Sequence, residues 1–300
     1  MGKEKSESKK CCYPKRLILH VAELSPSAWY DKRERIKEID KQKRGPRTNI
    51  SDEDLLQQLK DMLKEPLFIG EGYIKLHARL KQKNVNIGKN RLYRIMKAEN
   101  LLTHKYGNKG SGALHDGTII TEQPNRMWAT DGKQFYVNQE GKCWFIGIID
   151  HFNDEIKAFY ICKTFDRFAA MEPMRMAVKK VYGSIDKGVC KGMNIALRAD
   201  HGSQFDSKDY QKEIEYLGIN YSPAFVRSPE CNGIIERFHR TLNEQIFKNY
   251  TFENIEQANK KLGEFIENYN ENWLLHRLDL KSPRQYLKWY NQSKNEEKRN

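Results

Sequence analysis

Three acidic residues stand where carboxylates could bind metal ions. Asp131 lies in the middle of a β-rich run, flanked by Trp128 and Phe135. Asp200 closes the run MNIALRAD, and Glu236 lies in a segment with helical spacing. An unpaired acid inside a strand is costly to bury. Three acids without basic partners repel one another unless divalent cations neutralise them, and oxygen ligands of this kind suit Mg²⁺ or Mn²⁺.

Such a group of acids indicates phosphodiester chemistry. Two divalent ions about 3.5–4 Å apart can activate a nucleophile and stabilise the leaving oxygen of an in-line phosphoryl displacement. The spacing of the acids is specific, because 68 residues lie between Asp131 and Asp200 and 35 lie between Asp200 and Glu236.

The elements that would position these acids predict a mixed α/β core. The runs MWATDGKQFYV, KCWFIGIIDHF and EIKAFYICKTF indicate three successive antiparallel strands. A helix capped by Asp166 follows, then a strand MNIALRAD, a helix SKDYQKEIEYLG, a strand INYSPAF and a long helix that starts within NGIIERFHRTLNEQIF. This order predicts a five-stranded mixed sheet of the ribonuclease H-like architecture. Its first and fourth strands are neighbours, so we expect Asp131 and Asp200 to meet at one sheet edge with Glu236 alongside.

The N-terminal part of the chain is strongly basic. Residues 1–125 hold 26 Lys and Arg against 16 Asp and Glu, whereas the remaining residues hold 27 against 24, out of a net charge of +13. This excess favours a polyanionic partner such as nucleic acid, although ordinary solubilising charge is the alternative.

Five segments are predicted. We expect a basic, partly helical and partly disordered segment (1–50), a small all-α helix-turn-helix domain (51–102), a linker (103–126), a catalytic core with C-terminal helices (127–290) and a solvated tail (291–300). The second helix of the hairpin carries basic side chains that could face DNA: Lys89, Arg91, Arg94 and Lys97. A helical hairpin that serves only as a packing unit is the alternative.

With these motifs together, the chain resembles the DDE recombinases of the D,D(35)E signature, which include retroviral integrases, and most of all the OrfB-type bacterial insertion-sequence transposases. The strings WATDGKQF, RADHGSQF, SPECNGIIERFHRTL and YNENWLLHRLDLKSPRQY carry the resemblance, over about residues 51–290. It implies metal ligation and catalysis by Asp131, Asp200 and Glu236, two Mg²⁺ or Mn²⁺ ions, and donor-DNA contact by Arg240. Many members have Lys or Arg where this chain has Asn243, which leaves a second DNA contact of that helix open.

The resemblance also implies an activity and partners. A transposase of this kind would recognise the ends of its own element, cleave there and join the freed 3′-hydroxyl to target DNA. Double-stranded DNA would be the partner, with a homo-oligomer assembled on it and an upstream reading frame that supplies further DNA recognition. Two alternatives stay open: a ribonuclease H-like nuclease that hydrolyses without joining, and a helix-turn-helix regulator with an inert core.

Several single residues have simpler interpretations. We expect Asp150 to be a structural acid at a strand end and His201 to serve turn geometry, and His239, three residues after Glu236, to lie near the site.

Composition excludes other classes of protein. No stretch approaches the roughly 18 apolar residues that span a bilayer, and the opening MGKEKSESKK lacks the apolar segment of a signal peptide. Six cysteines without a C-x-x-C pair predict reduced thiols rather than a disulfide framework or a zinc site. The composition favours a reducing compartment, and the resemblance implies a bacterial cytoplasmic protein associated with the nucleoid.

Overall fold

A computed structural model describes residues 14–27, 50–64, 67–103, 121–222 and 232–297. The chain divides into two compact units, Met1–Asn49 and Ile50–Asn300. In the first unit, helix α1 spans Lys15–Val21. Most of the predicted basic segment (1–50) and most of the predicted linker (103–126) lie outside the described residues.

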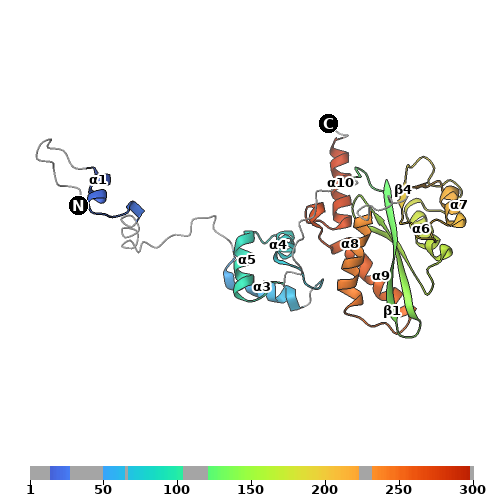
Figure 1. Cartoon of the computed structure of the whole chain (residues 1–300), viewed down its shortest axis with the longest axis horizontal. Coiled ribbons are helices and arrows are strands. Elements are labelled where there is room, and N and C mark those ends of the chain that lie inside the picture. The colour runs from blue at the N-terminus through green and yellow to red at the C-terminus, as the bar shows by residue number, and fades with distance from the viewer. Residues whose placement is uncertain (1–13, 28–49, 65–66, 104–120, 223–231, 298–300) are drawn as a thin grey trace, which may run out of the picture. The chain divides into compact units, whose positions relative to one another are not determined.

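A five-stranded sheet forms the centre of the second unit (Figure 1). Its strands are β1 (Met127–Val137), β2 (Gly141–Asp150), β3 (Ile156–Cys162), β4 (Ala196–Arg198) and β5 (Asn220–Tyr221). They are ordered β3-β2-β1-β4-β5, with β1, β2 and β3 antiparallel and β4 and β5 parallel to β1. This is the predicted ribonuclease H-like arrangement. The fourth strand is shorter than expected and pairs with β1 only over Met127–Ala129. The last part of the expected fifth strand, from residue 223 on, lies outside the described residues.

Helices pack on both faces of the sheet because successive side chains of a strand point to opposite faces. Trp128 and Ile148 pack with α6 (Arg167–Tyr182) and α7 (Lys208–Leu217). Phe135 and Phe145 pack on the other side with α8 (Gly233–Leu242) and α9 (Ile255–Asn272). The predicted cap of α6 is confirmed, since the Asp166 carboxylate accepts a hydrogen bond from the Ala169 N–H at 2.8 Å.

The C-terminal helices differ in detail from the sequence-based expectation. The predicted long helix is α8 followed by a π-helix over Asn243–Phe247. A short 3₁₀ helix (His276–Leu278) comes after α9, and α10 spans Pro283–Glu297. Helix α10 therefore continues into the residues that were expected to form a solvated tail.

In the described part of the second unit, three helices precede the sheet: α3 (Asp52–Lys64), α4 (Tyr73–Gln82) and α5 (Lys89–Ala98). Leucines at helical spacing form their common core: Leu55, Leu59, Leu76, Leu80 and Leu92. The loop between α3 and α4 contacts the C-terminal helices. The Phe68 ring lies 4.7 Å from that of Trp273, and the Gln245 side chain in the π-helix exchanges two 2.8 Å hydrogen bonds with the Ile69 backbone.

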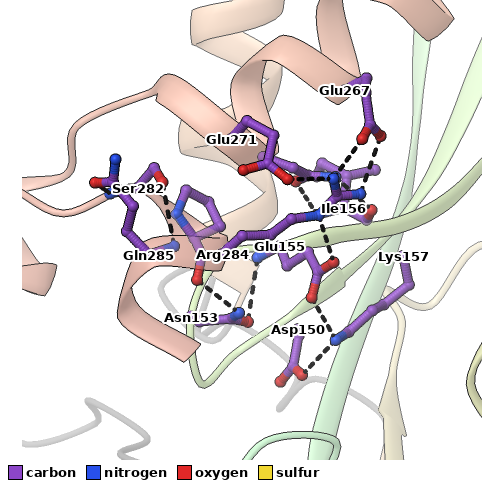
Figure 2. A network of polar contacts seen from close by, with 12 residues as sticks. Asp150, Asn153, Glu155, Ile156, Lys157, Glu267, Glu271, Ser282, Arg284 and Gln285 are labelled. Atoms are coloured by element: carbon purple, nitrogen blue, oxygen red, sulfur yellow. Dashed lines mark hydrogen bonds and ion pairs between the residues drawn. The ribbon is translucent and has the colours of Figure 1, made fainter. Parts of the chain in front are cut away.

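A buried polar network ties the end of β2 to α10 (Figure 2). Asp150 accepts hydrogen bonds from the backbone N–H groups of Asn125 and Phe152, and Lys157 Nζ lies 3.2 Å from its Oδ2. Lys157 also donates to Glu155 at 2.7 Å. Asp150 therefore has the structural role expected from its place at a strand end.

The same network continues to the C-terminal helices. Arg284 of α10 joins Glu155 to Glu267 and Glu271 of α9. The sheet end and the last two long helices are thus linked through a chain of charges that runs from the buried Glu155 to the exposed Glu267.

The state of the cysteines and the presence of membrane-spanning helices can be examined over the described residues. The cysteines among them, Cys143, Cys162 and Cys190, are free thiols. Within the same residues, every helix falls short of the length and apolarity that crossing a membrane requires.

Candidate active site

Asp131 lies in the middle of β1, opposite Gly147 of β2. Its Oδ1 accepts a hydrogen bond from the Gly132 N–H at 2.7 Å. Its Oδ2 lies 3.5 Å from Nδ1 of His239, a buried residue of α8. The carboxylate therefore sits between its own strand and the helix that carries Glu236.

Asp200 follows β4 after one intervening residue, Ala199, and accepts a hydrogen bond from the Gly202 N–H at 3.0 Å. Burial raises the pKa of this carboxyl, and repulsion from Asp131 and Asp206 raises it further. The hydrogen bond from the Gly202 N–H lowers the pKa and offsets part of this rise. The two acids that strand order was expected to bring together are thus close enough to repel each other.

Both acids line one open hollow of about 450 Å³, which we call the acid hollow. It is lined by Asp131, Gly132, Trp144, Lys163, Thr164, Phe165, Asp200 and Gln204. The strand order explains this placement: β4 stops pairing at Ala129, which leaves Asp131 and Gly132 open at the sheet edge beside the end of β4.

Glu236 occupies a different position from the one expected. It lies exposed in the first turn of α8 and is not among the residues that line the acid hollow. Over the described ranges, no group of three or more His, Cys, Asp or Glu side chains is close enough to hold a metal ion. The physical reason is the packing of α8: Ile235, Phe238 and Leu242 are buried in the core, which leaves Glu236 on the exposed face of the helix.

The side chains of the hollow nevertheless fit a hard divalent cation. Mg²⁺ is usually bound through one or two carboxylates and completes its octahedron with water and substrate phosphate oxygens. Asp131 and Asp200 supply such carboxylates, and a cation between them would relieve their repulsion. The helix that carries Glu236 already contacts the strand that carries Asp131, through His239 of α8. His239 lies three residues after Glu236.

The predicted DNA-contacting residues of α5 divide into two groups. Lys89, Arg94 and Lys97 are exposed. Arg91 is instead bound within the N-terminal helices: its Nε lies 2.7 Å from Asp52 Oδ1, and its Nη2 donates to the Ile50 carbonyl at 2.8 Å. The guanidinium of Arg91 therefore serves packing between α3 and α5.

Arg240 and Asn243 end the helix that carries Glu236. Arg240 is exposed in the last turn of α8, and Asn243 is the first residue of the π-helix. Asn243, the position where many members of the family have Lys or Arg, thus coincides with the change from α-helix to π-helix.

Part of the acid hollow was missed by sequence reasoning. Lys163 and Thr164 lie in the short connection after β3, and Trp144 pairs across the strands with Cys162. Only the strand register could have indicated this proximity. Gln204 stands within the string RADHGSQF, four residues after Asp200, and was the more accessible signal.

Comparison with known proteins gives consistent similarities. The family described as the TnsB C-terminal domain matches residues 132–251. Over 205 residues, or 67% of this chain, the sequence is 27% identical to the putative transposase InsD for insertion element IS2E of Escherichia coli K12, of which 92% is covered. The same identity relates it to the transposase InsD for insertion element IS2A/D/F/H/I/K of Escherichia coli, of which the match spans 66%, just under two thirds.

Solved structures with similar folds have low sequence identity. A simian T-cell lymphotropic virus intasome, in complex with the PP2A regulatory subunit B56 gamma, is 14% identical with a TM-score of 0.47, covering 79% of this chain and 74% of that one. The HTLV-2 integrase catalytic core domain in complex with magnesium gives 14% and 0.39, covering 55% and 97%. The catalytic domain of Mos1 mariner transposase also gives 14% and 0.39, covering 48% and 70%.

Proposed function

The chain is related to the transposases of bacterial insertion elements, and from this premise we propose that it cleaves the ends of a DNA element and joins them to target DNA. The observation that carries the proposal is the acid hollow, where Asp131 and Asp200 converge at the edge of the sheet. Water would be the nucleophile for cleavage, and the 3′-hydroxyl that cleavage frees would be the nucleophile for joining.

We assign the catalytic and metal-binding roles to Asp131, Asp200 and Glu236. Bound divalent cations, Mg²⁺ or Mn²⁺ and two in number, would lower the barrier by stabilising charge on the attacking and leaving oxygens. Asp131 and Asp200 are held for this role by backbone hydrogen bonds from Gly132 and Gly202. Glu236, in the first turn of α8, would complete the set of carboxylates.

DNA would contact two basic surfaces of the chain. The exposed side chains of Lys89, Arg94 and Lys97 on α5 suit phosphate contacts, and Arg240 suits the donor end. Because an element has two ends, a homo-oligomer on double-stranded DNA is part of the proposal, as are an upstream-frame DNA-binding partner and association with the nucleoid.

A strand-transfer assay tests the proposal. Pre-cut donor DNA, target DNA and Mg²⁺ should give joined product, and Asp131→Asn, Asp200→Asn and Glu236→Gln should each abolish cutting and joining while DNA binding persists. Cutting without joining would favour the ribonuclease H-like nuclease. Unchanged recombination in any of the three variants would contradict the assignment of that residue.

A further inference from the structure

One wall of the acid hollow is aromatic and basic. Trp144 of β2 and Phe165, which precedes α6, are half-buried with ring centroids 5.3 Å apart. Lys163 and Thr164 are exposed beside them. All four open onto the same hollow as Asp131 and Asp200. An aromatic pair and a cation thus line the same hollow as the two acids.

The aromatic wall is fixed in place by its packing. Phe165 lies 5.7 Å, centroid to centroid, from the fully buried Phe205. It also lies against β1, because a Cβ on Gly132 would overlap the Phe165 ring. Gly132 directly follows Asp131. Because glycine has no Cβ, this residue beside the Asp131 carboxylate lets the Phe165 ring approach β1 closely.

The charge of the wall suits a phosphate. Among the ion pairs between residues that the structure places, none involves Lys163, in contrast to the buried Lys157 with its two carboxylates. A free ammonium at the rim of a hollow is available to a phosphate oxygen of a nucleic acid.

Resting on the proposed function, we propose that the acid hollow is a nucleotide subsite in which Trp144 and Phe165 bind an unstacked nucleobase next to the scissile phosphate, while Lys163 binds an adjoining phosphate. Aromatic side chains stack on any base and contribute about 1–3 kcal/mol per base, which corresponds to about 5- to 150-fold in affinity. A hollow of about 450 Å³ lies within the usual size of ligand pockets. A base inside an intact duplex cannot reach the wall, so the DNA must open at the cleavage position.

Photocrosslinking tests this subsite directly. Duplex DNA with the inverted repeat that flanks the gene would carry 5-iodouracil at single positions on either side of the cleavage point. The Glu236→Gln protein keeps this DNA intact and leaves the hollow unchanged, since Glu236 does not line it. We expect irradiation to link one of these positions to the peptide that contains Trp144 or Phe165. Crosslinks confined to other peptides would overturn the proposal.

Affinity measurements separate stacking from packing. Trp144→Leu keeps an apolar side chain without an aromatic face and should weaken binding about 5- to 150-fold, whereas Trp144→Phe should stay within about 3-fold. Tyr136→Leu is the matched control, because Tyr136 is an exposed aromatic of β1 outside the hollow. Equal weakening by both Leu variants, or none by Trp144→Leu in a protein that melts normally, would refute stacking.

Salt dependence tests the lysine. Lys163→Gln should reduce the steepness of log affinity against log salt by the amount that one phosphate contact contributes. Lys142→Gln, which removes an exposed lysine of β2 outside the hollow, should leave that slope unchanged. An unchanged slope in Lys163→Gln would contradict its phosphate contact. If the unaltered chain cuts and joins this DNA while the subsite tests fail, only the subsite is wrong. If it neither cuts nor joins, the proposed function fails.

Discussion

Replacing Lys157 by Met should strongly destabilise the second unit. Lys157 is only 5% exposed and lies between Asp150, whose side chain is fully buried, and Glu155, which is 9% exposed. Met keeps the length of the side chain and removes its charge. Two buried carboxylates would then lose their shared cation, and removing one partner of a buried ion pair typically costs about 3–5 kcal/mol.

Part of that loss is moderated by the remaining partners. Asp150 keeps hydrogen bonds from two backbone N–H groups, at 2.9 and 3.0 Å, and Glu155 keeps Arg284 at 3.4 Å. We therefore expect the lower end of the range, about 3 kcal/mol. In a unit of 251 residues, Ile50–Asn300, each kcal/mol lowers the melting temperature by about 2–4 °C, so the fall should be about 6–12 °C.

Urea unfolding followed by tryptophan fluorescence measures this change. Lys142→Met, which removes an exposed lysine of the neighbouring strand, should change the free energy of unfolding by less than about 0.5 kcal/mol. Adding Asp150→Asn to Lys157→Met should recover about 0.5–3 kcal/mol, because one uncompensated charge is gone. The deficit of Lys157→Met should also shrink as pH falls, since protonation neutralises the unpaired carboxylates. A loss no larger than that of Lys142→Met would refute the reasoning.

Three further perturbations probe the site and its surroundings. Burial lowers the pKa of Lys75 to about 8 from its ordinary 10.5. Between these two pH values the unfolded chain binds more protons than the folded chain, so the free energy of unfolding rises with pH. The rise from pH 8 to 10, measured by urea titration, should therefore be smaller in Lys75→Met than in the unaltered chain. His239→Phe should weaken Mn²⁺ binding in calorimetry, whereas His239→Asn, which keeps a donor near Asp131, should retain it; equal affinities would exclude a positioning role for His239. Gly132→Ala should cost about 1–3 kcal/mol through overlap with Phe165, and Phe165→Leu should restore part of it; additive losses in thermal melts would contradict this contact.

The strand order was predictable because each strand carries its own local signal. Three β-rich runs with short turns predict an antiparallel meander, and the later strand–helix alternation predicts the parallel additions. Asp131 and Asp200 follow from this order, since neighbouring strands bring fixed residues to one edge. The N-cap at Asp166 was predictable for the same local reason.

Other features depend on contacts distant in sequence. No local pattern indicates that Arg91 binds Asp52, 39 residues earlier, rather than facing outward. Likewise, Lys163 reaches the acid hollow only through the register of β2 with β3. The position of Glu236 is set by the packing of a whole helix, which spacing along the chain does not encode.

The π-helix after α8 constrains how this sequence can change. A π-turn is equivalent to one extra residue inserted into an α-helix, and Gln245 uses that extra residue to face Ile69, from which it accepts one hydrogen bond and to which it donates another. Deleting a single residue from Asn243–Phe247 would restore a regular α-helix but would remove the wider turn that places Gln245 beside Ile69. The loop before α4 would then lose both hydrogen bonds to Gln245 and keep the packing of Phe68 on Trp273. Point substitutions can accumulate along this helix, but length changes in it must be matched by compensating changes 176 residues away.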